Sequence, residues 1–293
     1  MNIIGKRKLW YIISLILIVP MTIFILTHGL KLGLDFKGGQ ELEVSGVSQE
    51  RLEEIANQKD LGSYVVTTSG ESNLLIRYDA QDNPEEVRES LKTELEADGG
   101  KEESYNSIGP SISSEITINA VKALVIASIA IMLYIAFAFR NLPSEVDPLS
   151  FGVIAVIAML HDALILFGSF SVFGYFFGIE VDSLFITAVL TVIGFSVHDT
   201  IVVFDRVREN LGKLEADYPT AVNTSVVETM ARSMNTSVTV LITLAALWIF
   251  GGDSIKNFVL ALLIGITAGT YSSIFIASPL LVTWQKFKQN RIK

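Results

Sequence analysis

Two ionisable residues, His198 and Asp199, interrupt a run of apolar residues that is long enough to cross a membrane. A carboxylate in a bilayer is costly, and it is tolerated mainly where it faces a protein interior, a partner charge or an ion path. Asp199 is therefore the first candidate for a functional residue. Arg232, near the start of a later apolar run, adds a positive charge that proteins do not deprotonate.

The pair Asp199 and Arg232 suits proton movement. Burial favours the neutral form of a carboxyl group and an approaching arginine favours the charged form, so alternating contact with Arg232 would load and release a proton. We expect Asp199 to be the carrier and Arg232 to be the fixed charge that modulates it. Sodium is the alternative ion, because a carboxylate with nearby hydroxyl groups can coordinate either.

Helical spacing places further polar residues beside this pair. Ser196, Asp199 and Arg206 share one helix face, and Arg232 begins a second polar stripe at steps of 4, 3 and 4. Two such stripes facing one another would form a hydrated path. His198 either donates a hydrogen bond there or packs against a neighbouring helix. The supporting polar residues that we predict are Ser196, His198, Thr200, Asp205, Arg206, Thr236, Thr239, His161 and Asp162.

The adjacent residues His161 and Asp162 invite comparison with metal-dependent phosphohydrolases, whose His-Asp pair binds metal. Here the pair lies within an apolar run. Neighbouring residues on a helix project about 100° apart, which makes joint ligation of one metal awkward, and no third ligand follows at a typical spacing. We expect no metal and no cofactor, but a helix-packing contact or a secondary part of the ion path.

Hydropathy predicts the elements that carry these residues. Half of the residues are hydrophobic and 18% are charged, which is typical of a membrane protein. Six apolar runs approach the ~20 residues that cross a bilayer. They lie at about 9–27, 118–139, 149–173, 183–204, 235–251 and 257–284. The predicted fold class is a polytopic α-helical membrane protein with six transmembrane helices and one extracytoplasmic domain between the first and second.

Basic residues at the two ends of the chain predict its orientation. Both termini are expected in the cytoplasm, because such residues flank spans on the cytoplasmic side. The basic residues are Lys6, Arg7, Lys8, Lys286, Lys288, Arg291 and Lys293. The predicted organisation is an N-terminus and first span at 1–28, an exported domain at 29–117, five spans within 118–284 and a basic tail at 285–293. Residues 205–234 are predicted to form a cytoplasmic loop with a short surface helix after Pro219.

The segment 29–117 has the composition of a soluble domain, with 19 acidic residues against 8 basic ones. Its pattern predicts strands and helices in the order βαββαβ, which is that of a ferredoxin-like α+β domain. The acidity either keeps the surface soluble or attracts basic partners outside the membrane.

Small residues mark two places of close approach. Gly33-Leu-Asp35-Phe36-Lys-Gly38-Gly39 precedes the first strand, and its paired glycines predict a tight turn. Gly265-Ile-Thr-Ala-Gly269 in the last apolar run permits close helix contact. For this second pattern, packing within the chain's own bundle is favoured over a subunit interface.

The glycine turn and the run from Gly194 to Asn210 resemble signatures of the SecD and SecF family of protein-export membrane proteins. His161-Asp162 and the segment that begins at Arg232 match as well, although the family usually has asparagine where His198 stands. One small exported domain resembles the SecF branch of the family. The resemblance assigns Gly33, Asp35, Phe36, Gly38 and Gly39 to the family's signature turn.

This resemblance implies a protein that is not an enzyme. It implies a SecF-type subunit of the SecDF complex, related to resistance-nodulation-division exporters, which uses the proton motive force to promote preprotein export across a bacterial cytoplasmic membrane. The implied partners are SecD, the SecYEG channel and the translocating preprotein, with YajC and YidC as further candidates and no nucleic acid. The alternatives are a scaffold that stabilises the translocon, with Asp199 and Arg232 as a structural pair, and half of a small-molecule exporter.

Overall fold

The computed structural model describes residues 1–59, 61, 63–69, 73–79, 83–140, 148–213 and 215–292. Lys293 of the predicted basic tail therefore lies outside the described residues. The chain divides into two compact units, one formed by residues 1–31 and 122–293 and the other by residues 32–121. Each unit is described by itself.

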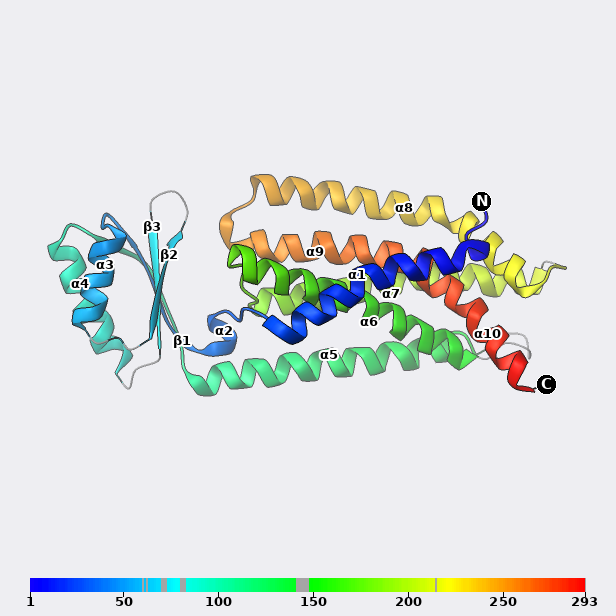
Figure 1. Ribbon diagram of the computed structural model, residues 1–293, viewed down its shortest axis with the longest axis horizontal. Coiled ribbons are helices and arrows are strands. Elements are labelled where there is room, and N and C mark those ends of the chain that lie inside the picture. The colour runs from blue at the N-terminus through cyan, green and yellow to red at the C-terminus, as the bar shows by residue number, and fades with distance from the viewer. Residues whose placement is uncertain are drawn as a thin grey trace. The chain divides into compact units, whose positions relative to one another are not determined.

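The larger unit is a bundle of long apolar helices (Figure 1). A 3-10 turn η1 (Ile4–Lys6) leads into α1 (Arg7–His28), and the later helices are α5 (Pro110–Ala138), α6 (Pro148–Phe177), α7 (Ser183–Lys213), α8 (Tyr218–Phe250), α9 (Asp253–Ser272), the π-helical turn η2 (Ser273–Ala277) and α10 (Ser278–Ile292). Six helical segments are long and apolar enough to span a membrane, and α9, η2 and α10 together form the sixth. The predicted number of spans is confirmed.

Helices α6, α7 and α9 form the inner part of the bundle, with α1 packed on α6 and α8 packed on α7 and α9. Three buried phenylalanines, Phe139, Phe151 and Phe204, pack against one another where α6 and α7 meet the end of α5. By contrast, α1, α5 and α8 expose large apolar side chains such as Ile16, Ile126 and Ile242. Such surfaces suit contact with lipid or with another apolar helix.

Most of the predicted loop at 205–234 is helical in the described residues. Helix α7 continues to Lys213, and α8 already begins at Tyr218 with proline in its first turn. Proline is favoured at that position, and no glycine or proline then follows until Gly251. The predicted surface helix is therefore the first part of α8, where Val222 and Val226 are fully buried in the core.

The beginning of the chain is fixed to this part of α8. The side-chain oxygen of Asn223 accepts hydrogen bonds from the backbone N–H groups of Ile3 and Ile4, at 2.9 and 3.2 Å, and both isoleucines are buried. The two termini of the chain lie at the same end of the bundle (Figure 1). An even number of crossings requires this arrangement.

The smaller unit contains one antiparallel sheet of four strands in the order β2-β3-β1-β4. Its elements are α2 (Leu34–Lys37), β1 (Gly39–Ser45), α3 (Gln49–Gln58), β2 (Tyr64–Ser69), β3 (Asn73–Tyr78), α4 (Pro84–Ala97) and β4 (Lys101–Ile108). Helices α3 and α4 cover one face of the sheet (Figure 1). Alternation along β1 explains this, because Leu42 and Val44 enter the core while Glu41 and Glu43 face the other side.

Glu43 connects the strands on the uncovered face of the sheet. Its carboxylate accepts hydrogen bonds from Ser69 of β2 at 2.9 Å, from Asn73 of β3 at 3.0 Å and from Ser104 of β4 at 3.2 Å. The bonds from Asn73 and Ser69 lower the pKa of Glu43 below its usual value of 4.5. The charged form therefore stabilises the sheet at neutral pH.

We predict that Glu43→Gln destabilises the sheet by about 1 kcal/mol at neutral pH, a modest value because the site is partly open to solvent. Since folding lowers this pKa, the stabilisation is present above pH 4.5 and is lost as the pH falls through the folded value. Hydrogen exchange of the β1 amides in the full-length protein measures the effect, with Glu50→Gln on the exposed surface of α3 as the control. An equal difference between wild type and variant at pH 3 and pH 7 would contradict this account.

Candidate functional site

Asp199 is buried on α7, with 6% of its surface exposed. Its oxygen Oδ2 has no hydrogen-bond partner among the described residues. Its neighbour across the helix contact is Ser233 of α8, whose hydroxyl oxygen is also buried. The two groups lie close enough to interact, but neither atom makes a hydrogen bond of normal geometry within the described residues. Unpaired buried polar atoms are rare and costly, so this pair is equipped to receive a proton, an ion or a water molecule.

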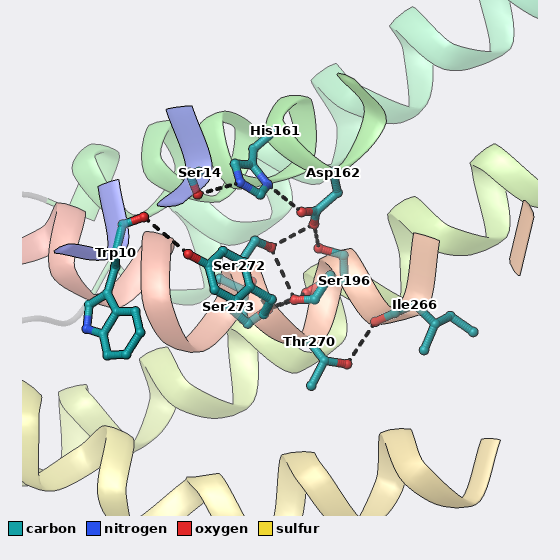
Figure 2. Close-up of polar contacts among 12 residues, drawn as sticks. Trp10, Ser14, His161, Asp162, Ser196, Ile266, Thr270, Ser272 and Ser273 are labelled. Atoms are coloured by element: carbon teal, nitrogen blue, oxygen red, sulfur yellow. Dashed lines mark hydrogen bonds and ion pairs between the residues drawn. The ribbon is translucent and has the colours of Figure 1, made fainter. Parts of the chain in front are cut away.

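Asp162 on α6 lies in the opposite situation, because its carboxylate is fully occupied. Its Oδ2 accepts hydrogen bonds from Ser196 of α7 at 2.5 Å and from Ser272 of α9 at 2.7 Å, while its Oδ1 pairs with Nδ1 of His161 at 2.9 Å. The other nitrogen of His161 bonds to Ser14 of α1 at 2.9 Å. Figure 2 shows Asp162 at the centre of these contacts. Asp162 and His161 together thus join four helices, α1, α6, α7 and α9.

The same network continues through the π-helical turn. Ser273 donates to the backbone oxygen of Ser196 at 3.2 Å, and its hydroxyl also lies 2.9 Å from that of Thr200. Ser278 donates to the backbone oxygen of Ser273 at 3.0 Å, which satisfies a carbonyl group within the turn. Local π-helical turns often occur at functional sites.

The predicted approach of Arg232 to Asp199 is not present in the described part of the chain. Arg232 is exposed, and so are Thr236, Thr239 and Thr243 of its stripe. Each of these threonine hydroxyls donates to a backbone oxygen of its own helix, for example Thr236 to Arg232 at 3.0 Å. The inward face of α8 is instead formed by Ser233 and Ser237, and Ser237 accepts a bond of 2.6 Å from Thr270 of α9.

The other predicted polar residues divide between the core and the surface. Ser196 and Thr200 are buried in the network, as are His161 and Asp162. His198 is exposed, and Asp205 forms an ion pair of 2.6 Å with Arg208 on the surface. Arg206 binds Glu228 of α8 at 2.6 Å, and Asn210 donates to the same carboxylate. These last contacts hold α7 and α8 together away from Asp199.

Sequence reasoning missed the buried serines Ser14, Ser233 and Ser237. Ser233 and Ser237 are each one position after a residue of the predicted stripe, so the inward face of α8 differs from the prediction by one residue's rotation. Spacing of hydroxyl residues could have found the serines, but it did not distinguish them from the threonines. Within the described residues, no group of three or more His, Asp and Glu side chains could hold a metal.

The glycine turn at 33–39 has the close approach that its sequence predicts. Gly38 and Gly39 adopt positive φ values of 73° and 119°. A Cβ atom at Gly39 would lie 2.8 Å from the backbone oxygen of Tyr78, so a larger residue does not fit there. Asp35 and Phe36 lie between them and Gly33 in the short helix α2.

The Gly265 and Gly269 pattern packs within the chain. A Cβ atom at Gly265 would lie 2.3 Å from Val192 of α7, and one at Gly269 would lie 2.8 Å from Cβ of Ser196. The favoured interpretation of this pattern, contact within the bundle, therefore describes the structure. The two glycines bring α9 close enough to α7 for its serines to enter the Asp162 network.

The sequence matches a known protein family and several relatives in that family. Residues 88–287 match the family described as protein export membrane protein SecD/SecF, C-terminal, and residues 23–46 match the SecD/SecF GG motif. The protein translocase subunit SecF of Thermobaculum terrenum is 43% identical over 97% of this chain and 94% of that protein. The translocase subunit SecDF of Bacillus subtilis is 35% identical over 96% of this chain but over 38% of its own length.

A solved structure is similar over nearly the whole chain. The crystal structure of SecDF from Thermus thermophilus, titled a translocon-associated membrane protein, is 30% identical with a TM-score of 0.84. This chain covers 98% of its own length there and 39% of that chain, so it corresponds to about two fifths of the solved protein.

Six apolar helices and a small antiparallel sheet thus define a multi-pass membrane protein of the protein-transport class. The chain belongs to the SecD/SecF family of protein export membrane proteins, and its relatives over nearly full length are translocase subunits named SecF.

The contact between α7 and α9 can be tested by adding one methyl group. We predict that Gly265→Ala destabilises the purified protein by about 1–3 kcal/mol, the usual cost of overpacking, because Val192 occupies the space. Gly194→Ala on α7 is the matched control, since nothing lies within 4 Å of a Cβ there. Thermal unfolding in detergent measures both. Equal unfolding temperatures for the two variants would contradict the packing described here.

Proposed function

We propose that this chain is a SecF-type subunit that couples the proton motive force to preprotein export. The observation that carries this proposal is Asp199, a buried membrane carboxylate with an unpaired oxygen beside an unpaired hydroxyl. The other buried acid of the described helix bundle, Asp162, is satisfied by donors. An ionisable residue left in this condition within a membrane is expected to serve an ion pathway.

The driving force is sufficient for the task. One elementary charge that crosses a membrane potential of 100 mV releases about 2.3 kcal/mol. Protonation of Asp199 would allow its oxygen to donate to a neighbouring group, whereas the charged form only accepts. Such a change alters the contact between α7 and α8, and the exported domain would then move against an emerging polypeptide. Sodium is the alternative coupling ion, with Ser233 as a nearby hydroxyl ligand.

Partners are proposed from the surface of α8. This helix exposes Arg232, Asn235 and three threonines within an apolar span, which favours coverage by another membrane protein over contact with lipid. A SecD subunit is the proposed occupant, since the SecDF relatives combine both parts in one chain. We further propose association with SecYEG and the preprotein, with YajC and YidC as additional candidates.

Arg232 would then act at the contact with the partner subunit rather than within this chain alone. Its charge faces the proposed partner and would reach Asp199 through a second arrangement of the helices. The scaffold alternative pairs the buried Asp199 with Arg232, and among the described residues Arg232 is exposed while Asp199 Oδ2 has no hydrogen-bond partner. Nothing in the site favours the small-molecule exporter.

The remaining proposals concern topology. The order of elements around the sheet β2-β3-β1-β4 supports a ferredoxin-like exported domain. Basic residues at both ends, which lie at one end of the bundle, support cytoplasmic termini in a bacterial cytoplasmic membrane.

We predict that Asp199→Asn slows the gradient-dependent release of a preprotein by more than about tenfold, since one charge per 100 mV corresponds to a larger factor than this. Membranes that contain this chain and its SecD partner are compared under an imposed proton gradient. Asp205→Asn makes the same chemical change on the exposed part of α7 and is the control. Equal release by Asp199→Asn and wild type, at equal expression, would refute proton coupling through this residue, and a sodium gradient would then test the alternative ion.

A further inference from the structure

A second buried carboxylate, Asp162, takes no part in the ion pathway proposed above. It is 1% exposed and its three donors come from three different helices, α6, α7 and α9. A carboxylate with this set of donors is held as an acceptor. Its contacts therefore suit a fixed structural element rather than a group that exchanges protons, and they lie next to the turn of α7 that carries Asp199.

That turn is held at both ends. Ser196, one turn before Asp199, donates to Asp162, and its backbone oxygen accepts from Ser273. Thr200, the residue after Asp199, lies within hydrogen-bond distance of Ser273. At about 100° per residue, Ser196 and Thr200 lie about 40° apart around the helix, and Asp199 lies about 60° beyond Ser196. Fixing the first two toward α6 and α9 leaves Asp199 directed at Ser233 of α8.

We propose that Asp162 is a positioning residue of the ion pathway, which holds α7 in the rotational setting where Asp199 faces α8. The inference rests on the proposed function of Asp199. Asp162 acts through its hydrogen bonds with Ser196 and Ser272. Ser273, at the start of the π-helical turn, supplies a second set of contacts, to Ser196 and Thr200 of α7. Rotation of α7 by about one residue would exchange Asp199 with these hydroxyls, so the network opposes that rotation.

His161 secures Asp162 from the other side. Because Asp162 accepts at Oδ1, the proton of His161 is assigned to Nδ1, and Nε2 then accepts from Ser14 of α1. The ring of Tyr271 stacks on that of His161, with 6.1 Å between the ring centroids. The Tyr271 hydroxyl donates to the backbone oxygen of Trp10. Figure 2 shows successive contacts from Ser14 through His161 and Asp162 to Ser196. Four helices thus define where the carboxylate lies.

The experiment compares Asp162→Asn and Ser272→Ala with Thr187→Ala. Asparagine keeps the shape of the side chain but replaces one accepting oxygen with a donor. Ser272→Ala removes the hydroxyl that donates to Asp162, and to the backbone oxygen of Gly269 in its own helix, with little change in volume. Thr187 is the matched control, because its hydroxyl is exposed and bonds to Ser183 of its own helix. Each variant is made in the full chain, assembled with its SecD partner, and assayed for gradient-dependent preprotein release.

A second readout reports the rotation of α7 directly. The chain has no cysteine, so Thr191→Cys on α7 and Val238→Cys on α8, both at exposed positions, can be spin-labelled specifically. We expect Ser272→Ala to slow release about threefold, the value of one average hydrogen bond between membrane helices, and Asp162→Asn to slow it further. Both are expected to shift or broaden the distance distribution between the labels, while Thr187→Ala changes neither readout.

The outcomes separate this inference from the proposed function. Release that is blocked by Asp199→Asn but unchanged by Ser272→Ala and Asp162→Asn would overturn the positioning role. Slower release with an unchanged distance distribution would also overturn it, since the hydroxyl groups would then act in another way. If Asp199→Asn itself has no effect, the proposed function fails, and unchanged distances in the two variants would still refute the control of rotation.

Discussion

Polar groups that no water can reach must find partners within the protein, and the rest of this structure depends on that constraint. Asp162 meets it with three donors. The exposed threonines of α8 meet it by bonding to their own helix. Asp199 and Ser233 do not meet it among the described residues. Among the described residues, the site is therefore distinguished by buried polar atoms that lack a hydrogen bond of normal geometry, more than by its charge.

Close packing makes the compensated part possible. Gly265 and Gly269 allow α9 to approach α7, and this approach places Ser272 and Ser273 beside Ser196 and Thr200. The π-helical turn begins at Ser273, the residue that contacts Ser196 and Thr200 of α7. Small residues, hydroxyl groups and one carboxylate thus form a single contact region between the helices, next to the turn of α7 that carries Asp199. The arrangement connects helix packing to the direction in which Asp199 points.

Much of the architecture followed from sequence because it depends on length and periodicity. Six apolar runs predicted six spans, the pattern of residues 29–117 predicted a segment of strands and helices, and the location of Asp199 in an apolar run predicted its burial. The face of α8 on which Arg232 lies was not predicted correctly from the sequence. Threonine satisfies its own hydroxyl group on a helix, so a stripe of threonines carries little information about which face is buried.

Other features depend on contacts that sequence spacing does not encode. The segment after Pro219 was predicted as a short surface helix, whereas in the structure it is the first part of α8, with Val222 and Val226 in the core. The π-helical turn and the joining of four helices at Asp162 require knowledge of which helices are neighbours. His161 and Asp162 were recognised as a polar pair, but their partners Ser14 and Ser272 come from opposite ends of the chain.

The central claim is that Asp199 changes its protonation when the membrane is energised. Infrared difference spectra of the reconstituted complex, recorded with and without an imposed proton gradient, measure this directly. The account predicts a change in the carbonyl band of a protonated carboxyl group that is lost in Asp199→Asn and retained in Asp205→Asn. A band that persists in Asp199→Asn, or no change on energisation while preprotein release continues, would contradict it.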